Sequence, residues 1–205
     1  MPNSRVSQRV PFRAATCVLL TGWICFFLIS DLILGTSVRV VNLVEMVSLA
    51  DRIFLGQCVS FEDVVDPVLQ MPVTEYRFVV QQGIKGVGTG EEILVRQIGG
   101  IFDIPRYQKG ERLLIFLHVD SQLGLTSPVG MGQGIFQVEK GSQGITVTNA
   151  LQNQNLVYNL TGQLPLALDL NTEDLEDLTE ERIDLEVMLT ILGRISSSLD
   201  SVSPR

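Results

Sequence analysis

The segment ADRIFLGQCVSFEDVV, residues Ala50–Val65, begins a series of apolar stretches that predicts the fold. Apolar side chains occupy both alternating sets of positions in it, which is typical of a strand buried on both faces and therefore central in its sheet. Gly56 has no side chain, so it favours a bend or bulge at that point. Three similar stretches follow it: TEYRFVVQQGIKG (Thr74–Gly86), EEILVRQIGG (Glu91–Gly100) and YQKGERLLIFLHVD (Tyr107–Asp120).

Shorter elements surround these strands. Asn42 is followed three residues later by Glu45, a capping-box pattern that predicts a short amphipathic helix over Leu43–Ala50. Farther along, alternation over Ile135–Asn149 predicts a hairpin whose turn lies at Lys140–Gly144. We also expect a last short strand at Val157–Tyr158.

The composition changes after Pro165, where acidic residues become frequent. Thr179 is a favourable N-cap, and Ile183, Val187, Ile191 and Ile195 recur every four residues, so Glu180–Ile195 is predicted to be a helix. The expected organisation is residues 1–37 as a signal peptide or membrane anchor, 38–160 as a β-barrel domain, 161–178 as an acidic linker, 179–196 as an amphipathic helix and 197–205 as a disordered tail.

The N-terminal segment resembles a secretory signal. Arg5, Arg9 and Arg13 precede the apolar run Ala14–Ser30, and small residues at Gly35 and Ser37 suit cleavage after Ser37. The alternative is an uncleaved anchor, because Ala14–Leu34 approaches the roughly 20 residues that cross a bilayer. Either outcome places the main domain outside the cytoplasm, in the periplasm, in the extracellular space or anchored to a membrane and facing outward.

The charge balance excludes several partners. Removing the three arginines and one aspartate of the first 37 residues leaves 12 basic and 22 acidic residues, a net charge of −10. Such a surface repels phosphate backbones and anionic lipid headgroups, so nucleic acid is not an expected partner and the membrane is one only through an uncleaved N-terminal segment.

The sequence contains no complete catalytic or metal-binding pattern. Its one histidine, His118, is expected on a strand whose neighbours are apolar, without a serine or cysteine motif, so a structural role and a hydrolytic one both stay open. Cys58 lies in mid-strand and is expected to be a small buried side chain, with a free thiol or an intermolecular bridge as alternatives. Neither residue can form a zinc site with so few ligands, and we expect no cofactor.

Two further motifs are incomplete. Gly130, Gly132 and Gly134 lack the Lys and Ser/Thr of a phosphate loop, so they are expected to permit bulges or close backbone packing. The residues Asp169, Asn171, Glu173 and Glu180 have the spacing of a calcium loop, but Asp174 replaces its required glycine. A solvated acidic linker is the expectation there, with weak calcium binding as the alternative.

The remaining candidate is a small basic patch on an otherwise acidic protein. It would contain four cationic residues and one tyrosine near one end of the barrel, and it could bind a partner or be an ordinary solvated surface. Its residues are Arg96, Arg106, Tyr107, Lys109 and Arg112.

The phrases LADRIFLGQCVS, TEYRFVVQQGIKG, VRQIGG, YQKGERLLIFL and GQGIFQV resemble an uncharacterised group of exported bacterial proteins. Their order over Val38–Tyr158 is also similar to the OB-type barrel of netrin-like domains and tissue inhibitors of metalloproteinases. This resemblance implies a mainly β fold, an OB-like closed or partly open barrel of five to six strands with a short N-terminal helix and a C-terminal helix. The alternative fold is a β-sandwich.

The resemblance transfers no site residue. Those inhibitors present a disulfide-tethered N-terminal cysteine to a catalytic zinc, whereas this chain has no cysteine between Phe26 and Gln57. We therefore expect an exported, non-enzymatic binding module whose partner is another envelope or extracellular protein. An inhibitor or accessory of an extracellular protease, and a hydrolase that uses His118, are the alternatives.

Overall fold

The computed structural model describes residues 39–99, 106–142, 144–160 and 170–202, without the side chains of residues 200 and 202. The described residues all belong to one compact unit that begins at Arg39. The predicted signal or anchor at 1–37 and the last residues of the predicted tail lie outside them. Within the described ranges, no helix is both long and apolar enough to cross a membrane.

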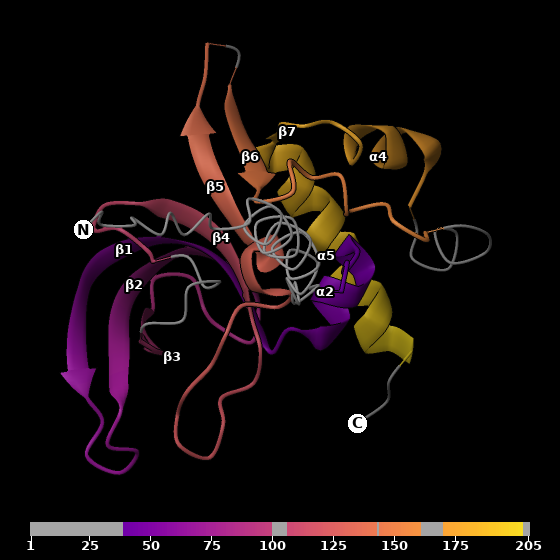
Figure 1. Cartoon of the computed structure of the whole chain (residues 1–205). Coiled ribbons are helices and arrows are strands. Elements are labelled where there is room, and N and C mark those ends of the chain that lie inside the picture. Colours follow the sequence, from indigo (N-terminus) through magenta and orange to yellow (C-terminus); the bar gives the residue numbers. More distant parts are fainter. Residues whose placement is uncertain (1–38, 100–105, 143, 161–169, 203–205) are drawn as a thin grey trace, which may run out of the picture. The chain divides into compact units, whose positions relative to one another are not determined.

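The fold is mainly β, with one antiparallel sheet of seven strands (Figure 1). Its strands stand in the order β3-β2-β1-β4-β5-β6-β7, so the sheet ends in two edges and is not closed. The helices flank this sheet at the two ends of the described chain. The elements are α2 (Leu43–Leu49), β1 (Arg52–Val65), β2 (Pro72–Lys85), β3 (Glu92–Ile98), β4 (Arg112–Leu117), the 3-10 helix η1 (Met131–Gly134), β5 (Ile135–Lys140), β6 (Ile145–Asn149), α4 (Thr172–Asp177), β7 (Ile183–Asp184) and α5 (Leu185–Val202).

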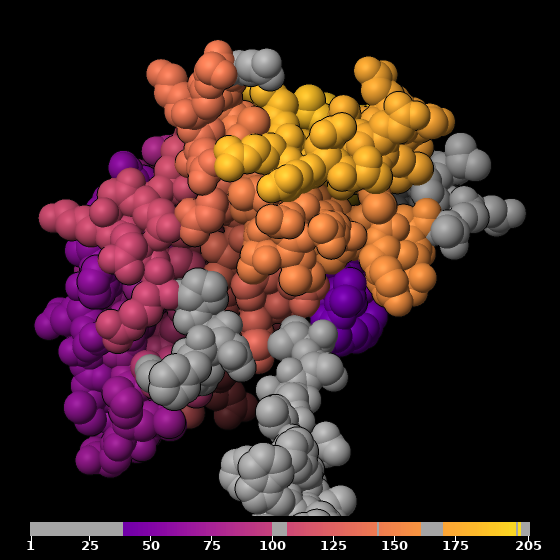
Figure 2. All heavy atoms as spheres, turned by 45° about the horizontal axis from the view of Figure 1, so that its top comes forward, coloured from indigo at the N-terminus to yellow at the C-terminus, as the bar shows by residue number. Residues whose placement is uncertain are grey.

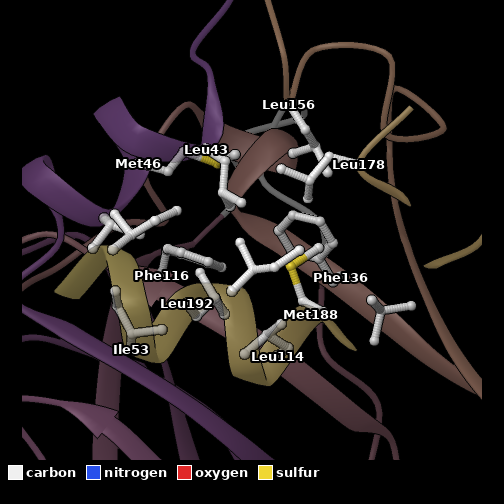
Figure 3. Packing of buried hydrophobic residues seen from close by; sticks show 14 of the residues in the cluster. Leu43, Met46, Ile53, Leu114, Phe116, Phe136, Leu156, Leu178, Met188 and Leu192 are labelled. Atoms are coloured by element: carbon white, nitrogen blue, oxygen red, sulfur yellow. The ribbon is translucent and has the colours of Figure 1, made fainter. Parts of the chain in front are cut away.

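Strand β4 and residues Ile53–Leu55 of β1 are buried on both faces, and the strand order confirms the central position predicted for β1. All five residues from Leu113 to Leu117 are fully buried. Leu114 and Phe116 face a core shared with α2 and α5, where Met46, Met188 and Leu192 meet them (Figure 3). Burial of each such side chain contributes roughly 1.5–3 kcal/mol, so this core is the main source of stability.

The opposite face of β4 packs on a second, mainly aromatic core. Leu113, Ile115 and Leu117 contact it together with residues from β1, β2 and β3. The ring centroids of Tyr76 and Tyr107 lie 4.7 Å apart in an edge-to-face arrangement, and Phe78 adds a second such contact with Tyr107 at 5.3 Å. The β1–β2 pair curls around this core through three register shifts, one of them between Leu55 and Gly56, as the glycine predicts.

The local predictions at the start of the unit are confirmed. The Asn42 side chain accepts a hydrogen bond from the Glu45 backbone N–H at 2.9 Å, and Glu45 accepts one from the Asn42 N–H, which completes the capping box of α2. The hairpin of β5 and β6 also forms around the predicted turn.

Residues 150–159 form successive turns, so the strand predicted at Val157–Tyr158 is wrong. Buried amides hold this segment against the start of the unit. Asn155 Nδ2 donates to Val41 O at 2.6 Å, and Gln133 Oε1 accepts from Val41 N at 2.9 Å. Gln133 Nε2 also donates to Arg39 O at 3.0 Å. In Figure 2 the orange 150–160 segment lies directly against the indigo α2 region, and these side-chain bonds take the place of strand pairing.

The C-terminal region divides differently from the sequence prediction. The predicted linker contains α4, which Asn171 and Asp174 cap. Helix α5 begins at Leu185 instead of near Thr179, because Ile183–Asp184 pairs with β6 as strand β7. The Asp184 carboxylate then caps the helix by accepting hydrogen bonds from the N–H groups of Glu186 and Val187. The helix continues to Val202, through much of the predicted tail.

Replacing Gln133 by Ala tests the amide network. The substitution leaves the buried Val41 N–H without a partner, so we expect the free energy of unfolding to fall by about 2–3 kcal/mol. Urea denaturation followed by circular dichroism measures this change. Gln154→Ala, in the exposed part of the 150–159 turns, serves as the control and should change stability by less than about 0.5 kcal/mol. Equal losses in the two variants would contradict the role given to Gln133.

Candidate functional site

The guanidinium of Arg96 connects three segments that are distant in sequence. Its Nη2 donates to Asp66 Oδ2 at 2.6 Å, its Nε to Glu75 Oε1 at 3.0 Å, and its Nη1 to the backbone oxygen of Leu123 at 3.0 Å. The backbone oxygen of Arg96 also accepts from Thr126 N–H at 2.9 Å. This residue at the edge of the sheet therefore fixes both the β1–β2 turn and the loop that follows β4.

Asp66 organises the β1–β2 turn from inside. Its Oδ1 accepts from the backbone N–H groups of Val68 and Leu69, both at 2.8 Å, and the residue is buried. The bond from Leu69, followed by those from Arg96 and Val68, lowers the pKa of the Asp66 carboxyl below its ordinary value of 3.8. The turn is thus built around an ionised carboxylate.

The loop after β4, residues 118–128, lines part of an open hollow of about 500 Å³. Hydrogen bonds hold the loop in shape: His118 N–H donates to Ser127 O at 3.0 Å, and Thr126 Oγ1 donates to His118 O at 2.6 Å. Pro128 forms a β-bridge with Leu117 that returns the chain to the sheet. The residues lining the hollow come from β3, this loop and η1, and they are Ile98, His118, Val119, Ser121, Leu125, Thr126, Ser127 and Met131.

The rim of this hollow exposes large apolar side chains. Val119 is 68% exposed and Met131 is 37% exposed. Met131 has a φ of +58°, the left-handed conformation that favours glycine, and it follows Gly130, which has a φ of +62°. A non-glycine residue in this region is strained by about 1–3 kcal/mol. Strain of this kind is concentrated at functional sites, so it marks Met131 as a candidate binding residue.

His118 lies half-buried in the wall of the hollow, together with Ser121 and Ser127. The Ser121 hydroxyl accepts a hydrogen bond from Leu125 N–H at 3.1 Å. Among the described residues, no carboxylate or hydroxyl hydrogen-bonds to the imidazole of His118. The hollow combines apolar side chains with the imidazole of His118 and the hydroxyls of Ser121, Thr126 and Ser127.

The predicted basic patch is divided by the structure. Tyr107 is only 1% exposed, and its hydroxyl accepts from Gln97 Nε2 at 3.0 Å, so its ring belongs to the aromatic core. Burial raises the pKa of that hydroxyl. Arg106 Nη2 donates to both carboxylate oxygens of Asp63 at 2.9 Å. Arg96 is also paired, with the carboxylates of Asp66 and Glu75.

The other two members of the patch are Arg112, the first residue of β4, and Lys109, which precedes the strand. The Nε of Arg112 donates to Gln81 Oε1 at 2.6 Å, while Lys109 lies in the exposed turn before the strand. The four cations therefore do not share one environment, and partner binding through them stays a prediction. The sequence did not single out three features, namely the β1–β2 turn, the 118–128 loop and Met131. A methionine within a glycine-rich stretch is an unusual choice, however, and could have drawn attention to Met131.

The remaining candidates have structural roles. Cys58 is fully buried, as predicted, and burial is the main cause that raises the pKa of its thiol. A Cβ at Gly134 would lie 2.4 Å from Val129 O, which confirms close backbone packing in the glycine-rich stretch. In the acidic region, Asn171 and Asp174 cap α4 and Asp174 pairs with Arg194. No cluster of three metal-ligating side chains occurs among the described residues, and Asp169, the first residue of the calcium-loop spacing, lies outside them.

Comparisons with known proteins give no information on the function of this chain. No protein-family profile matches the chain, and neither a curated protein nor a solved structure matches it. Its function must therefore be argued from the hollow and the residues that hold it.

Replacing Asp66 by Asn tests the turn through its pH dependence. The folded pKa of Asp66 lies below the unfolded one, so its contribution to the free energy of unfolding is complete above the unfolded value of 3.8 and is lost as the pH falls through the lower folded value. We expect Asp66→Asn to be less stable than the wild type at neutral pH and to lose less stability between about pH 4 and pH 2.

Arg96→Met removes only one of the groups that stabilise the Asp66 carboxylate, so it is compared with Asp66→Asn by urea denaturation at each pH. It should weaken the pH dependence less than Asp66→Asn, because the bonds from Leu69 and Val68 to the carboxylate remain. An Asp66→Asn variant with the same pH dependence as the wild type would contradict this description of the turn.

Proposed function

We propose that the chain is an exported, non-enzymatic binding module that receives an apolar segment of another envelope or extracellular protein in the hollow beside Arg96. The observation that carries this proposal is Met131, an exposed apolar side chain kept at the rim in a backbone conformation where glycine would be unstrained. We infer that the Met131 side chain is needed at this position, where glycine would be unstrained.

The rigidity of the site supports the proposal. The loop is tied to β3 through Arg96, to β4 through Pro128 and to itself through Thr126 and Ser121. A surface that is ordered before binding loses little conformational entropy when its partner arrives. Its exposed apolar side chains, bordered by hydroxyls and one imidazole, have the mixture of apolar lining and a few polar groups that is typical of binding pockets.

We infer an OB-like, partly open barrel as the finer architecture. The order β3-β2-β1-β4, the register shifts of β1 and the two packed faces of β4 support it. The 118–128 loop reaches the outer edge of β3 through the Thr126–Arg96 backbone bond and so covers part of the open seam. Loops at such a seam are suited to carry a binding site on a stable scaffold.

Export is the part of the proposal that rests on the N-terminal sequence. Three arginines followed by an apolar run favour passage through a membrane, with either cleavage after Ser37 or retention as an anchor. A partner reached in this way is another exported or envelope protein. An inhibitor or accessory of an extracellular protease is one form of such a module, and direct inhibition assays with purified proteases would identify it.

A hydrolase using His118 is the second candidate, favoured by the presence of Ser121 and Ser127 in the same hollow. His118→Ala separates the two: it should leave partner capture intact, because the apolar rim is unchanged, and it would abolish a hydrolytic activity. An activity that depends on His118 would replace the binding proposal.

The proposal is tested by a photo-crosslinking amino acid placed at Val119 of the exported protein, in its native host. We expect one discrete adduct from position 119 and none from Leu151, a similarly apolar exposed residue outside the hollow. Loss of the adduct in Met131 variants ties the capture to the hollow.

The Met131 variants distinguish binding from folding. Met131→Gly removes the side chain together with the strain, so stability should change by less than about 1 kcal/mol while the adduct is lost. Met131→Ala keeps the strained backbone and should lose both stability and the adduct, whereas Met131→Leu should retain the adduct. Undiminished crosslinking in Met131→Gly would overturn the role of this rim.

A further inference from the structure

Strand β1 extends beyond the strand that pairs with its second edge. Residues Arg52–Gln57 pair with β4, and the Gly110 N–H then donates to Cys58 O at 2.7 Å. From there to its end, β1 pairs only with β2. Residues Phe61–Val65 therefore form a free edge of the sheet, along the β1–β2 arm that projects at the lower left of Figure 1.

The register of β2 shows which backbone groups point outward from this edge. The Val80 N–H donates to Glu91 O across the β2–β3 pair, so the even-numbered residues of β2 face β3. Because the direction alternates along a strand, the odd-numbered residues face β1, and among them Glu75 lies directly opposite Glu62. The residues of the free edge whose N–H and C=O groups point away from the sheet are Phe61, Asp63 and Val65.

These outward groups are accessible and unpaired. In the part of the chain that the structure describes, none of them takes part in a backbone hydrogen bond. Phe61 is 41% exposed and Val65 is 69% exposed. Natural edges are often closed by lysine or proline, and the sequence SFEDVV at residues 60–65 contains neither. Such an edge can accept a further strand through backbone hydrogen bonds.

The charge of the edge argues against a second copy of this chain as that strand. An antiparallel pair of copies that uses the whole edge sets the two Asp63 residues opposite each other. The registers on either side set Glu62 opposite Glu62 or opposite Asp66. Like charges directly opposite are destabilising, and the acidic surface of the whole chain adds to the repulsion.

The same charge favours a basic occupant. Glu62 is exposed, and no cation among the described residues pairs with it. Asp63, in contrast, already accepts from Arg106 and from the Thr74 hydroxyl. The unsatisfied carboxylate therefore lies on the side-chain face of Glu62, opposite the face on which Phe61 contacts the aromatic core through Tyr76, at 6.1 Å between ring centroids.

We propose that the free edge Phe61–Val65 binds an extended segment of a partner protein in which apolar and basic residues alternate. The backbone of this segment pairs with the outward N–H and C=O groups. Its apolar side chains lie beside Phe61 and Val65, and its basic side chains lie beside Glu62. The acids thus have two effects, because they repel a second copy and attract a basic strand.

This inference does not rest on the function proposed for the hollow. None of the residues of the free edge lines that hollow, so the two surfaces can be tested one at a time. Crosslinking at Val119 reports on the hollow alone.

The probe is the synthetic peptide Val-Lys-Val-Lys-Val with blocked ends, and Val-Glu-Val-Glu-Val is its matched control. Residue-resolved hydrogen exchange is measured on the full-length chain in a non-ionic detergent. At ten times its Kd, the lysine peptide should slow exchange about ten-fold at the amides of Phe61, Asp63 and Val65. The amides of Glu62 and Val64, which bond to β2, should not change, and the glutamate peptide should have no effect.

Glu62→Lys tests the charge preference without disturbing the fold, since this side chain is exposed. The substitution should weaken binding of the lysine peptide by about three- to ten-fold. It should also allow the glutamate peptide to protect the outward amides. Unchanged exchange at the amides of Glu75 and Val64 in the variant shows that the β1–β2 pair is intact.

Four results would overturn the proposal. Two concern the lysine peptide: no protection of the outward amides, or equal protection of outward and β2-facing amides. The third is equal binding of the two peptides by the wild type. The fourth is alternating protection without peptide that rises with protein concentration, which would assign the edge to a second copy.

Discussion

The ion-paired guanidinium of Arg96 is the constraint on which the β1–β2 turn and the 118–128 loop both depend. It neutralises a buried carboxylate, caps the backbone of a loop and fixes two connections that the sheet alone would leave apart. Removing one partner of a buried, hydrogen-bonded charge pair is far more destabilising than the pair itself is stabilising. Both the β1–β2 turn and the hollow lined by the 118–128 loop therefore rely on one side chain.

The rest of the fold supplies a platform for this end. The apolar residues of β4 face two cores, so the strand that leads into the 118–128 loop is anchored on both sides. At the far side of the first core, buried amides fix the segment at Arg39 where the compact unit begins. Strain is tolerated at Met131 because the surrounding structure holds it in place, and a rigid scaffold of this kind allows loops to carry recognition.

Sequence reasoning succeeded where the determining contacts are local. The capping box joins Asn42 and Glu45, which are three positions apart, the β5–β6 hairpin pairs neighbouring strands, and Gly56 marks its own bend. It failed where distant residues decide. Arg96 looked like a member of a cationic patch because its partners, 30 and 27 residues away, are not apparent from the sequence. Helix α5 starts late because two residues pair with β6, and the hollow has no sequence pattern at all.

Hydrogen–deuterium exchange in the wild type and in Arg96→Met tests the central claim most directly. If one guanidinium organises this end of the molecule, the backbone amides of residues 66–71 and of 118–128 will lose protection together in the variant. The β5–β6 hairpin and α2 will keep theirs, because they depend on the other core. Unchanged exchange in both segments, or a uniform loss of protection across the described chain, would contradict the claim that Arg96 organises this end of the molecule.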